Sequence, residues 1–291
     1  MKSLRIATLQ GKWFKTTEAT NAWYVSEAKK LKDSKLDILV LPELYHTPYF
    51  PIEEGEKGFD WAIEKNDALV SEWQTIAKEL NAVVVFPFFE KRARGIYYNS
   101  AYVFERDGSI AGLYRKSHIP DDPGFYEKYY FAPGDTGFEP IQTSAGKIGV
   151  LICWDQWFPE AARCMALMGA QLLFYPTAIG SEPIIECDSM PHWRRCMQGH
   201  SAANVIPVIA ANRIGEEKVL PSKDNNNQSS TLVFYGSSFI TDETGELIET
   251  ANRDEETIIL HTFDLDDIEE MRMSWGLFRD RRPEMYRKIT E

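Results

Sequence analysis

The chain lacks any long apolar run. Its first residues, Met1 to Gln10, hold only a short apolar stretch before polar residues return. A secretory signal needs ~7–15 consecutive apolar residues and a transmembrane helix needs ~18 or more. We therefore expect a cytoplasmic protein that has no signal peptide, no membrane span and no membrane partner.

Cysteine and positive charge are also scarce. None of the four cysteines forms a C-x-x-C pair or a zinc-binding spacing, so we expect reduced thiols, no metal and no cofactor. Lysine and arginine number 32 against 44 aspartates and glutamates, which gives a net charge of -12. Such a surface repels phosphate backbones, which argues against nucleic acid as a partner, and it attracts small cations.

What the chain does contain is typical of a globular enzyme. The 291 residues are 44% hydrophobic and 26% charged, enough to bury a core around an active site. No internal repeat or low-complexity linker interrupts them. We expect one domain over residues 1–291, with a C-terminal arm at about 272–291 that shows no clear periodicity.

Predicted strands alternate with predicted helices along the chain. Apolar runs indicate strands and amphipathic patterns indicate helices. A hairpin around Asp107-Gly108 is also expected. The mixture favours an α/β sandwich over a purely parallel sheet. The main expected strands are 4–9, 36–41, 82–89, 98–104, 110–114, 148–153 and 206–211, and the main expected helices are 17–31, 67–80, 159–168 and 192–204.

Three reactive residues stand at the ends of predicted strands. Glu43 lies in Leu-Pro-Glu-Leu-Tyr, Lys116 in Tyr-Arg-Lys-Ser-His and Cys153 in Gly-Val-Leu-Ile-Cys-Trp-Asp. Open α/β sheets bind ligands at the carboxyl ends of their strands. We therefore expect a carboxylate, an ammonium and a thiol to converge at one sheet edge.

This set of groups suits hydrolysis through a thiol nucleophile. The pKa of Cys153 is expected to be lowered by a cation or by the helix that begins near Pro159, because either favours the thiolate. Glu43 is a candidate general base and acid. Lys116 and the backbone N–H that follows Cys153 are candidate donors to an oxyanion.

Each of these residues, taken singly, also has an ordinary interpretation. A cysteine at a strand end is commonly a small buried apolar residue, and a glutamate or lysine in a loop is commonly solvated. A Cys–His pair is an alternative, with His118, His192 and His200 as candidate bases, although no histidine stands at a comparable strand end. A thiol redox sensor is a further alternative, but no resolving cysteine adjoins Cys153 in the sequence.

Three segments resemble the glutamate, lysine and cysteine motifs of the nitrilase superfamily, the carbon–nitrogen hydrolases. They are Leu41 to Tyr45, Tyr114 to His118 and Gly149 to Asp155, in that order along the chain. The similarity extends from Arg5 to Glu284. Further segments resemble members that hydrolyse a small ureide with an ammonium group at its far end; these are 118–131, 133–137, 153–163, 176–183 and 274–283.

The resemblance implies an α-β-β-α sandwich that forms a four-layer homodimer or a higher homo-oligomer. It implies catalysis by Glu43, Lys116 and Cys153, with Glu127 as a second glutamate that braces the lysine and the substrate nitrogen. The implied partner is a small cationic ureide substrate.

The resemblance also suggests residues that contact the substrate. Glu182 is the first candidate to bind the distal ammonium, and Tyr49, Phe125 and Trp154 are candidates to line the aliphatic chain. A solvated loop position is the ordinary alternative for Glu182, as it is for Glu127.

Rival functions stay open at this point. β-Ureidopropionases and N-carbamoyl amino acid hydrolases share the scaffold, but their substrates end in a carboxylate and would require Arg or Lys in place of Glu182. A true nitrilase, which acts on a cyano group, is a more distant match. A non-catalytic member that binds a small molecule is the alternative from another class, and it would not need the Glu-Lys-Cys set.

Overall fold

Two six-stranded sheets form the centre of the computed structural model, which describes residues 3–181 and 187–291. Each sheet has three parallel strands in its interior, flanked by antiparallel strands. The first sheet runs in the order β14 (Thr257–Asp264), β1 (Ser3–Gln10), β2 (Ile38–Val40), β3 (Val83–Ala93), β4 (Ile96–Phe104) and β5 (Ile110–Arg115). The second runs in the order β13 (Leu247–Thr250), β12 (Phe239–Thr241), β9 (Val208–Asn212), β8 (Leu172–Thr177), β7 (Gly146–Val150) and β6 (Ile141–Thr143).

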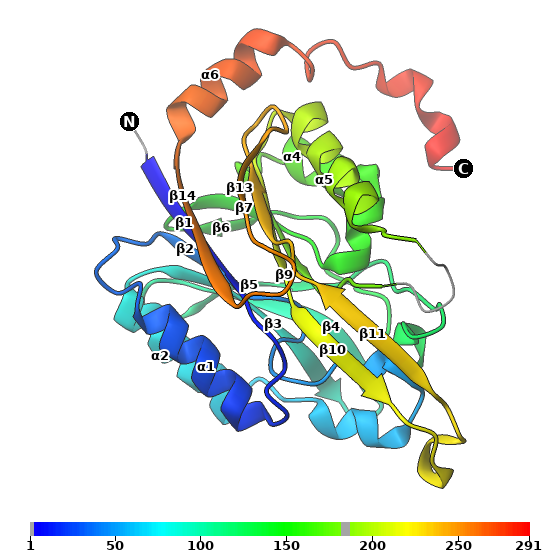
Figure 1. Ribbon diagram of the computed structural model, residues 1–291. Coiled ribbons are helices and arrows are strands. Elements are labelled where there is room, and N and C mark those ends of the chain that lie inside the picture. Colours follow the sequence, from blue (N-terminus) through cyan, green and yellow to red (C-terminus); the bar gives the residue numbers. More distant parts are fainter. Residues whose placement is uncertain (1–2, 182–186) are drawn as a thin grey trace.

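Helices cover the outer faces of the two sheets. In Figure 1, α1 and α2 lie on one side of the paired sheets and α4 and α5 on the other. The fold is therefore the α-β-β-α sandwich that the sequence predicts, and that prediction is confirmed. The helices are α1 (Thr17–Lys29), α2 (Ala68–Leu80), α3 (Glu127–Tyr130), α4 (Pro159–Leu167), α5 (Met190–Asn204) and α6 (Leu265–Trp275).

The side chains of each strand alternate between its two faces, which explains how the helix and sheet layers pack together. On β3, Val83 and Val85 point into the core shared with the second sheet. Val84 and Phe86 point the other way and pack with Trp73 of α2. Successive side chains of a strand face opposite sides, and each fully buried large apolar side chain contributes about 1.5–3 kcal/mol. A continuous apolar run such as Val83 to Phe86 therefore fits a strand that is buried on both faces.

Local sequence signals set the ends of α2 as predicted. The Asp67 carboxylate caps the helix by accepting from the backbone N–H of Leu69 at 2.9 Å. Asn81 ends the helix in the left-handed conformation at φ 50°. Both are residue types that favour these positions.

One expectation about secondary structure is wrong, and two features were not predicted. The strand expected at 148–153 ends at Val150, and Cys153 instead begins a 3₁₀ turn, Cys153–Trp157. The unpredicted features are helix α6, which overlaps the start of the expected arm and is capped by Asp264 through the N–H of Asp266, and the hairpin of β10 (Ile214–Val219) and β11 (Ser230–Tyr235).

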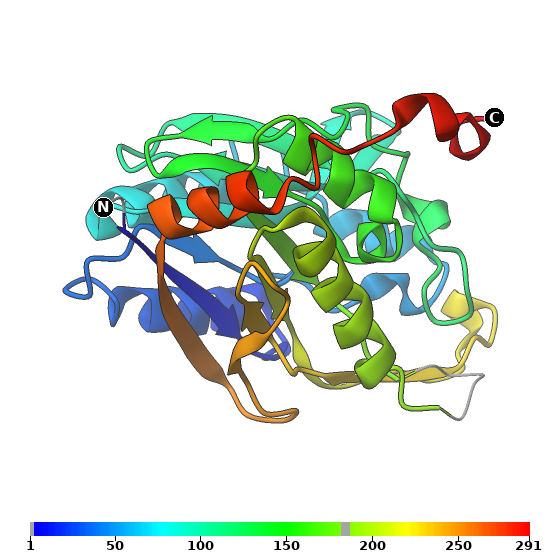
Figure 2. The ribbon, with the colours of Figure 1, turned by 90° about the horizontal axis from the view of Figure 1, so that it is seen from above.

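The chain beyond α6 is exposed. In Figures 1 and 2 this segment runs away from the sandwich and ends outside it. Large apolar side chains on the arm face solvent, with Met273, Trp275 and Met285 each more than 65% exposed. None of the described residues lies in a helix long and apolar enough to cross a lipid bilayer.

Candidate active site

Glu43 lies just after β2 and is fully buried. One of its oxygens, Oε1, accepts from Lys116 Nζ at 2.8 Å and from Asn99 Nδ2 at 2.6 Å. The other oxygen, Oε2, has no hydrogen-bond partner among the described residues. The carboxylate is therefore held through one oxygen, and its second oxygen is available to accept a proton.

Lys116 directly follows β5 and joins two carboxylates. Its Nζ lies 2.6 Å from Glu127 Oε2 as well as 2.8 Å from Glu43 Oε1, and all three side chains are buried. Burial acts to lower the pKa of Lys116, but the charges of Glu127 and Glu43 outweigh it and the pKa lies above its usual value. Lys116 is thus a cation. Gly134 permits this packing, because a Cβ there would lie 2.0 Å from the Arg115 carbonyl oxygen.

Glu127 is the first residue of the short helix α3. Its Oε1 accepts from the Tyr49 hydroxyl at 2.7 Å, while Oε2 accepts from Lys116. Burial raises the pKa of Glu127 to about 7, against the opposing effects of Lys116 and Tyr49. The two carboxylates share the single ammonium of Lys116. Ionising both carboxylates is therefore costly, and one of them readily keeps its proton.

Cys153 occupies a strained position at the start of its 3₁₀ turn. Its φ of 41° is left-handed, which is uncommon for a residue other than glycine and recurs at functional sites. The Sγ lies 3.7 Å from the Ala178 carbonyl oxygen. Burial and the charge of Glu43 raise the pKa of the Cys153 thiol well above its usual value, and Lys116 only partly opposes them. The expectation of a lowered pKa is therefore wrong, and a nearby base is needed to remove the proton.

The thiol and the acid–base groups come from different sheets. Glu43 and Lys116 follow β2 and β5 of the first sheet, whereas Cys153 follows β7 of the second. The expectation of a single sheet edge is therefore wrong. The charges of Glu43, Lys116 and Glu127 nevertheless all act on the thiol, so the two sheets present one electrostatic cluster.

The structure describes three of the four residues expected to contact the substrate. Tyr49 is buried and packs edge-on against the half-buried Phe125, with ring centroids 5.7 Å apart. Trp154 is half-buried and follows Cys153 directly. Glu182 lies outside the described residues.

Asn99 is a site residue that the sequence reasoning missed. It is fully buried on β4 and donates to the general-base candidate Glu43. The available signal was an Asn-Ser pair within a strand whose other residues are aromatic or apolar. A polar residue on the buried face of a strand needs a partner, so it indicates a polar neighbour across the core.

The candidate histidines contact other groups. His118 Nδ1 lies 2.8 Å from Asp155 Oδ1, and His200 Nε2 lies 2.6 Å from the Gln156 carbonyl oxygen. His192 packs against Trp157. Across residues 3–181 and 187–291, no group of three or more His, Cys, Asp or Glu side chains is arranged to hold a metal ion.

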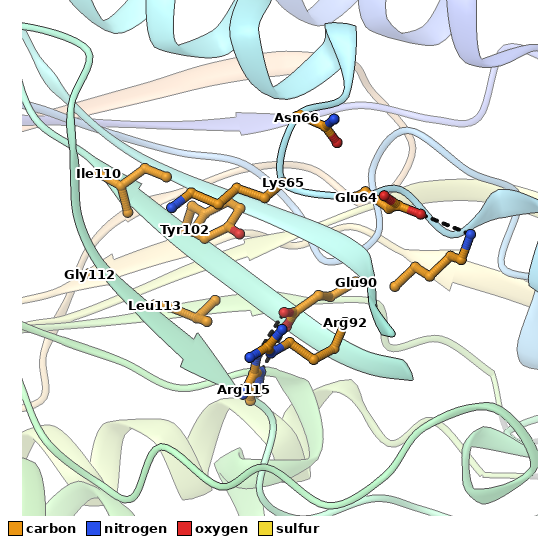
Figure 3. A pocket seen from close by; sticks show the side chains of 11 residues that line it. Glu64, Lys65, Asn66, Glu90, Arg92, Tyr102, Ile110, Gly112, Leu113 and Arg115 are labelled. Atoms are coloured by element: carbon orange, nitrogen blue, oxygen red, sulfur yellow. Dashed lines mark hydrogen bonds and ion pairs between the residues drawn. The ribbon is translucent and has the colours of Figure 1, made fainter. Parts of the chain in front are cut away.

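A pocket of about 850 Å³ opens on a different part of the first sheet (Figure 3). Arg115, next to Lys116 in the chain, points into this pocket and pairs with Glu90 at 2.6 Å. Arg115 is the last residue of β5 and Lys116 the first residue after it, and their side chains lie in two separate environments. The candidate site residues within the described part of the chain do not line this pocket.

The sandwich, and a thiol under the influence of a buried Glu–Lys–Glu cluster, are the features of a hydrolase. The chain belongs to the carbon–nitrogen hydrolase family, whose family model matches residues 5–273. This confirms the family expected from the glutamate, lysine and cysteine motifs.

Named relatives and a solved structure extend the match over most of the chain. It is 50% identical over 255 residues to an N-carbamoylputrescine amidase from Arabidopsis thaliana, covering 87% of this chain and 84% of the relative. It is 45% identical over 294 residues to a citrullinase from Francisella tularensis, covering 100% and 99%. A crystal structure of a carbon–nitrogen hydrolase from Helicobacter pylori G27 superposes with a TM-score of 0.91 at 42% identity, covering 99% of each chain.

Proposed function

We propose that the protein hydrolyses N-carbamoylputrescine to putrescine, carbon dioxide and ammonia. The observation that carries this proposal is the free Oε2 of Glu43, held on a carboxylate whose Oε1 is fixed by Lys116 and Asn99. A buried thiol with a raised pKa needs a base of this kind. The similarity to N-carbamoylputrescine amidases supports the choice of substrate.

In the first half-reaction, Cys153 Sγ attacks the ureido carbon as its proton passes to Glu43 Oε2. Lys116 and the backbone N–H of Trp154 stabilise the resulting oxyanion. One carbon–nitrogen bond then breaks, and the departing nitrogen takes the proton from Glu43. A thiocarbamoyl enzyme remains.

In the second half-reaction, Glu43 removes a proton from water, which attacks the thiocarbamoyl carbon. The carbon–sulfur bond breaks and the thiol regains its proton. The carbamate released on hydrolysis loses carbon dioxide and frees the nitrogen that stayed on the enzyme, which is ammonia if the amine left first and putrescine if ammonia left first. Glu127 keeps Lys116 in place throughout, because it shares the ammonium with Glu43.

The surroundings of Tyr49 favour a cationic substrate. Tyr49 lines a pocket of about 1100 Å³, and its backbone N–H donates to Glu217 at 2.6 Å. Five glutamates and three lysines line this pocket, and Arg213 pairs with one of those glutamates, Glu217, at 2.6 Å. The small negative charge that remains attracts an ammonium group more than a carboxylate, although Glu43, Lys116 and Cys153 do not line the pocket. We propose Glu182 as the direct partner of that ammonium, with Phe125 and Trp154 against the four-carbon chain.

Citrulline hydrolysis is the second candidate function. Its support is the full-length similarity to a citrullinase, which exceeds the coverage of the amidase match. Citrulline carries the same ureido group and an ammonium, but it adds a carboxylate. The acidic lining near Tyr49 disfavours that carboxylate, so we rank citrulline second.

Ammonia release from three ureides tests the ranking. We expect kcat/KM for N-carbamoylputrescine to exceed that for citrulline by about tenfold or more, since one unfavourable charge contact is worth about 1.4 kcal/mol or more. N-carbamoyl-β-alanine, which ends in a carboxylate alone, should be the poorest of the three. A higher kcat/KM for citrulline would reverse the ranking and make citrulline hydrolysis the first candidate function.

A Glu182→Gln variant tests the ammonium contact. We expect KM to rise about tenfold for N-carbamoylputrescine and to stay nearly constant for N-butylurea, which has no ammonium. Equal changes for both substrates would reject this role for Glu182.

We also propose a homo-oligomer in the cytoplasm. The apolar side chains of the arm that face solvent support burial against a second copy. The four cysteines are all free thiols, which supports a reducing compartment. Light scattering of the intact chain and of Trp275→Glu protein tests the self-association, and we expect the variant to have the lower mass.

A further inference from the structure

We propose that Asp155 is a positioning residue that fixes Cys153 relative to Lys116, an inference that rests on the proposed role of both residues in catalysis. Asp155 is fully buried and lies two residues after the thiol. A buried carboxylate is costly unless several donors satisfy it. The identity of those donors carries the proposal.

Four donors surround the carboxylate. Oδ2 accepts from the backbone N–H of Ile152 at 2.9 Å and from the Tyr114 hydroxyl at 2.7 Å. Oδ1 accepts from the backbone N–H of His118 at 3.0 Å and lies 2.8 Å from His118 Nδ1. Hydrogen bonds to a charged acceptor are roughly twice as strong as those between neutral groups.

The donors flank both reactive groups in the chain. Ile152 immediately precedes Cys153, whereas Tyr114 and His118 stand two residues before and two residues after Lys116. Asp155 therefore joins the segment that carries the thiol to the segment that carries the ammonium. Because these segments follow strands of different sheets, no strand pairing links them directly.

Packing stiffens this link from both sides. The Asp155 N–H donates to the Ile152 carbonyl at 3.1 Å, which closes the turn at the thiol. The His118 ring stacks on Phe158, with centroids 3.6 Å apart. The strained φ of Cys153 persists only where its surroundings fix it, and these contacts supply that constraint.

Asp155 acts through geometry rather than through charge on the thiol. The largest influences on the Cys153 pKa are burial, Glu43, Lys116, Glu127 and the Ala178 carbonyl, and Asp155 is not among them. Loss of the link should therefore slow the attack without moving the pH profile of the reaction. A displacement of about 1 Å at a reacting atom is enough to lower a rate by about 10²-fold.

Asp155→Asn is the test variant, because it keeps the size of the side chain and replaces one accepting oxygen by an NH₂ donor. We expect kcat to fall by about 10²-fold, KM to change less than about threefold and the pH profile of kcat to keep its position. Tyr114→Phe removes a single donor and should lower kcat by about tenfold. Tyr114 and Asp155 act through the same hydrogen bond, so the effects of the two substitutions should not add. We expect kcat of the double variant to be at most about threefold lower than kcat of Asp155→Asn.

Glu90→Gln is the matched control. Glu90 is also a buried carboxylate with several donors, and it holds Arg115, the neighbour of Lys116 in the chain (Figure 3). In the part of the chain that the structure describes, its side-chain hydrogen bonds go to Ser100 and Arg115 and not to the turn at Cys153. We expect Glu90→Gln to lower the thermal midpoint as much as Asp155→Asn while changing kcat less than about threefold.

Alkylation of Cys153 by iodoacetamide separates this proposal from the choice of substrate. We expect the alkylation rate to fall about tenfold in Asp155→Asn and to be unchanged in Glu90→Gln, whichever ureide the enzyme prefers. Equal losses of kcat in the two variants, or unchanged kcat and alkylation in Asp155→Asn, would overturn the role of Asp155. If Asp155→Asn does not fold, Tyr114→Phe carries the same comparison.

Discussion

The two halves of the sandwich hold their reactive groups by different means. We call the sheet from β14 to β5 and its loops the acid–base half. Its side chains Glu43, Lys116 and Glu127 are held in place by their opposite charges. We call the sheet from β13 to β6 and its loops the thiol half. There, a strained backbone in a short turn holds Cys153. In the mechanism that we propose, charge fixes the group that accepts and donates protons, and backbone geometry fixes the nucleophile.

This difference has a consequence for stability. Burying three charged side chains is costly, and each depends on its partners for compensation. Burying a neutral thiol costs little, because a free cysteine behaves as a small apolar residue. Substitutions in the acid–base half should therefore lower both activity and stability, whereas loss of the thiol should lower activity alone.

Cys153→Ala should have the largest effect on activity. We expect turnover to fall by about 10⁴-fold or more, because no other group forms the covalent bond. The thermal midpoint should change little. Ammonia release under saturating N-carbamoylputrescine measures the first quantity and calorimetry the second, and normal turnover would end the proposed mechanism.

Lys116→Met should affect both properties. We expect kcat to fall by about 10²–10³-fold, since an oxyanion donor is lost. The free energy of unfolding should fall by about 3–5 kcal/mol, because Glu43 and Glu127 lose their buried counter-ion. Urea denaturation measures the second effect. If the Lys116→Met and Cys153→Ala proteins had equal free energies of unfolding, the predicted difference in stability between the two halves would be wrong.

Tyr49→Phe tests the tuning of Glu127. The Tyr49 hydroxyl stabilises the ionised carboxylate, so its removal should raise the pKa of Glu127 above the present value of about 7. We propose that ionised Glu127 braces Lys116, so the acidic limb of the kcat profile should move about one unit toward higher pH. A downward movement would show that the sign of this argument is wrong.

His46→Phe should have the smallest effect, and its readout is stability. His46 is buried in the acid–base half, and its ring nitrogens have no hydrogen-bond partner among the described residues. Burial, aided by Arg213, lowers its pKa from 6.5 to about 3. The stabilisation linked to neutral His46 is therefore complete above pH 6.5 and is lost as the pH falls toward 3.

The comparison of His46→Phe with the unmodified protein uses two pH values. Between pH 7 and pH 5, the unmodified protein should lose about 2 kcal/mol more of its free energy of unfolding than the variant loses. Urea denaturation at both pH values measures the difference. Parallel losses in the two proteins would mean that His46 takes no part in acid sensitivity.

Local patterns predicted much of the fold. The helix at 67–80 matches α2 closely, because an Asp cap and a clear apolar face are both local signals. The hairpin of β10 and β11 was missed because Glu216, Glu217 and Lys218 stand in succession and hide the alternation of a strand. Periodicity reports which segments are strands, but it does not report which sheet each strand joins.

The same limit applies to the candidate site. The reactive side chains could be predicted as strand-end residues, and the structure places Lys116 between Glu43 and Glu127. Their division between two sheets depends on long-range pairing, which the sequence pattern does not encode. Asn99 and Asp155 were missed for this reason, since each contacts residues that are distant in sequence.

The most direct measurement is the mass of the peptide containing Cys153 after acid quenching during turnover of N-carbamoylputrescine. If the amine leaves first, the peptide should gain about 43 Da, because a carbamoyl group replaces the thiol hydrogen; if ammonia leaves first, the gain should also include the aminobutyl chain. Ammonia release with Cys153 unmodified at every time point, or with the added mass on another residue, would contradict the account.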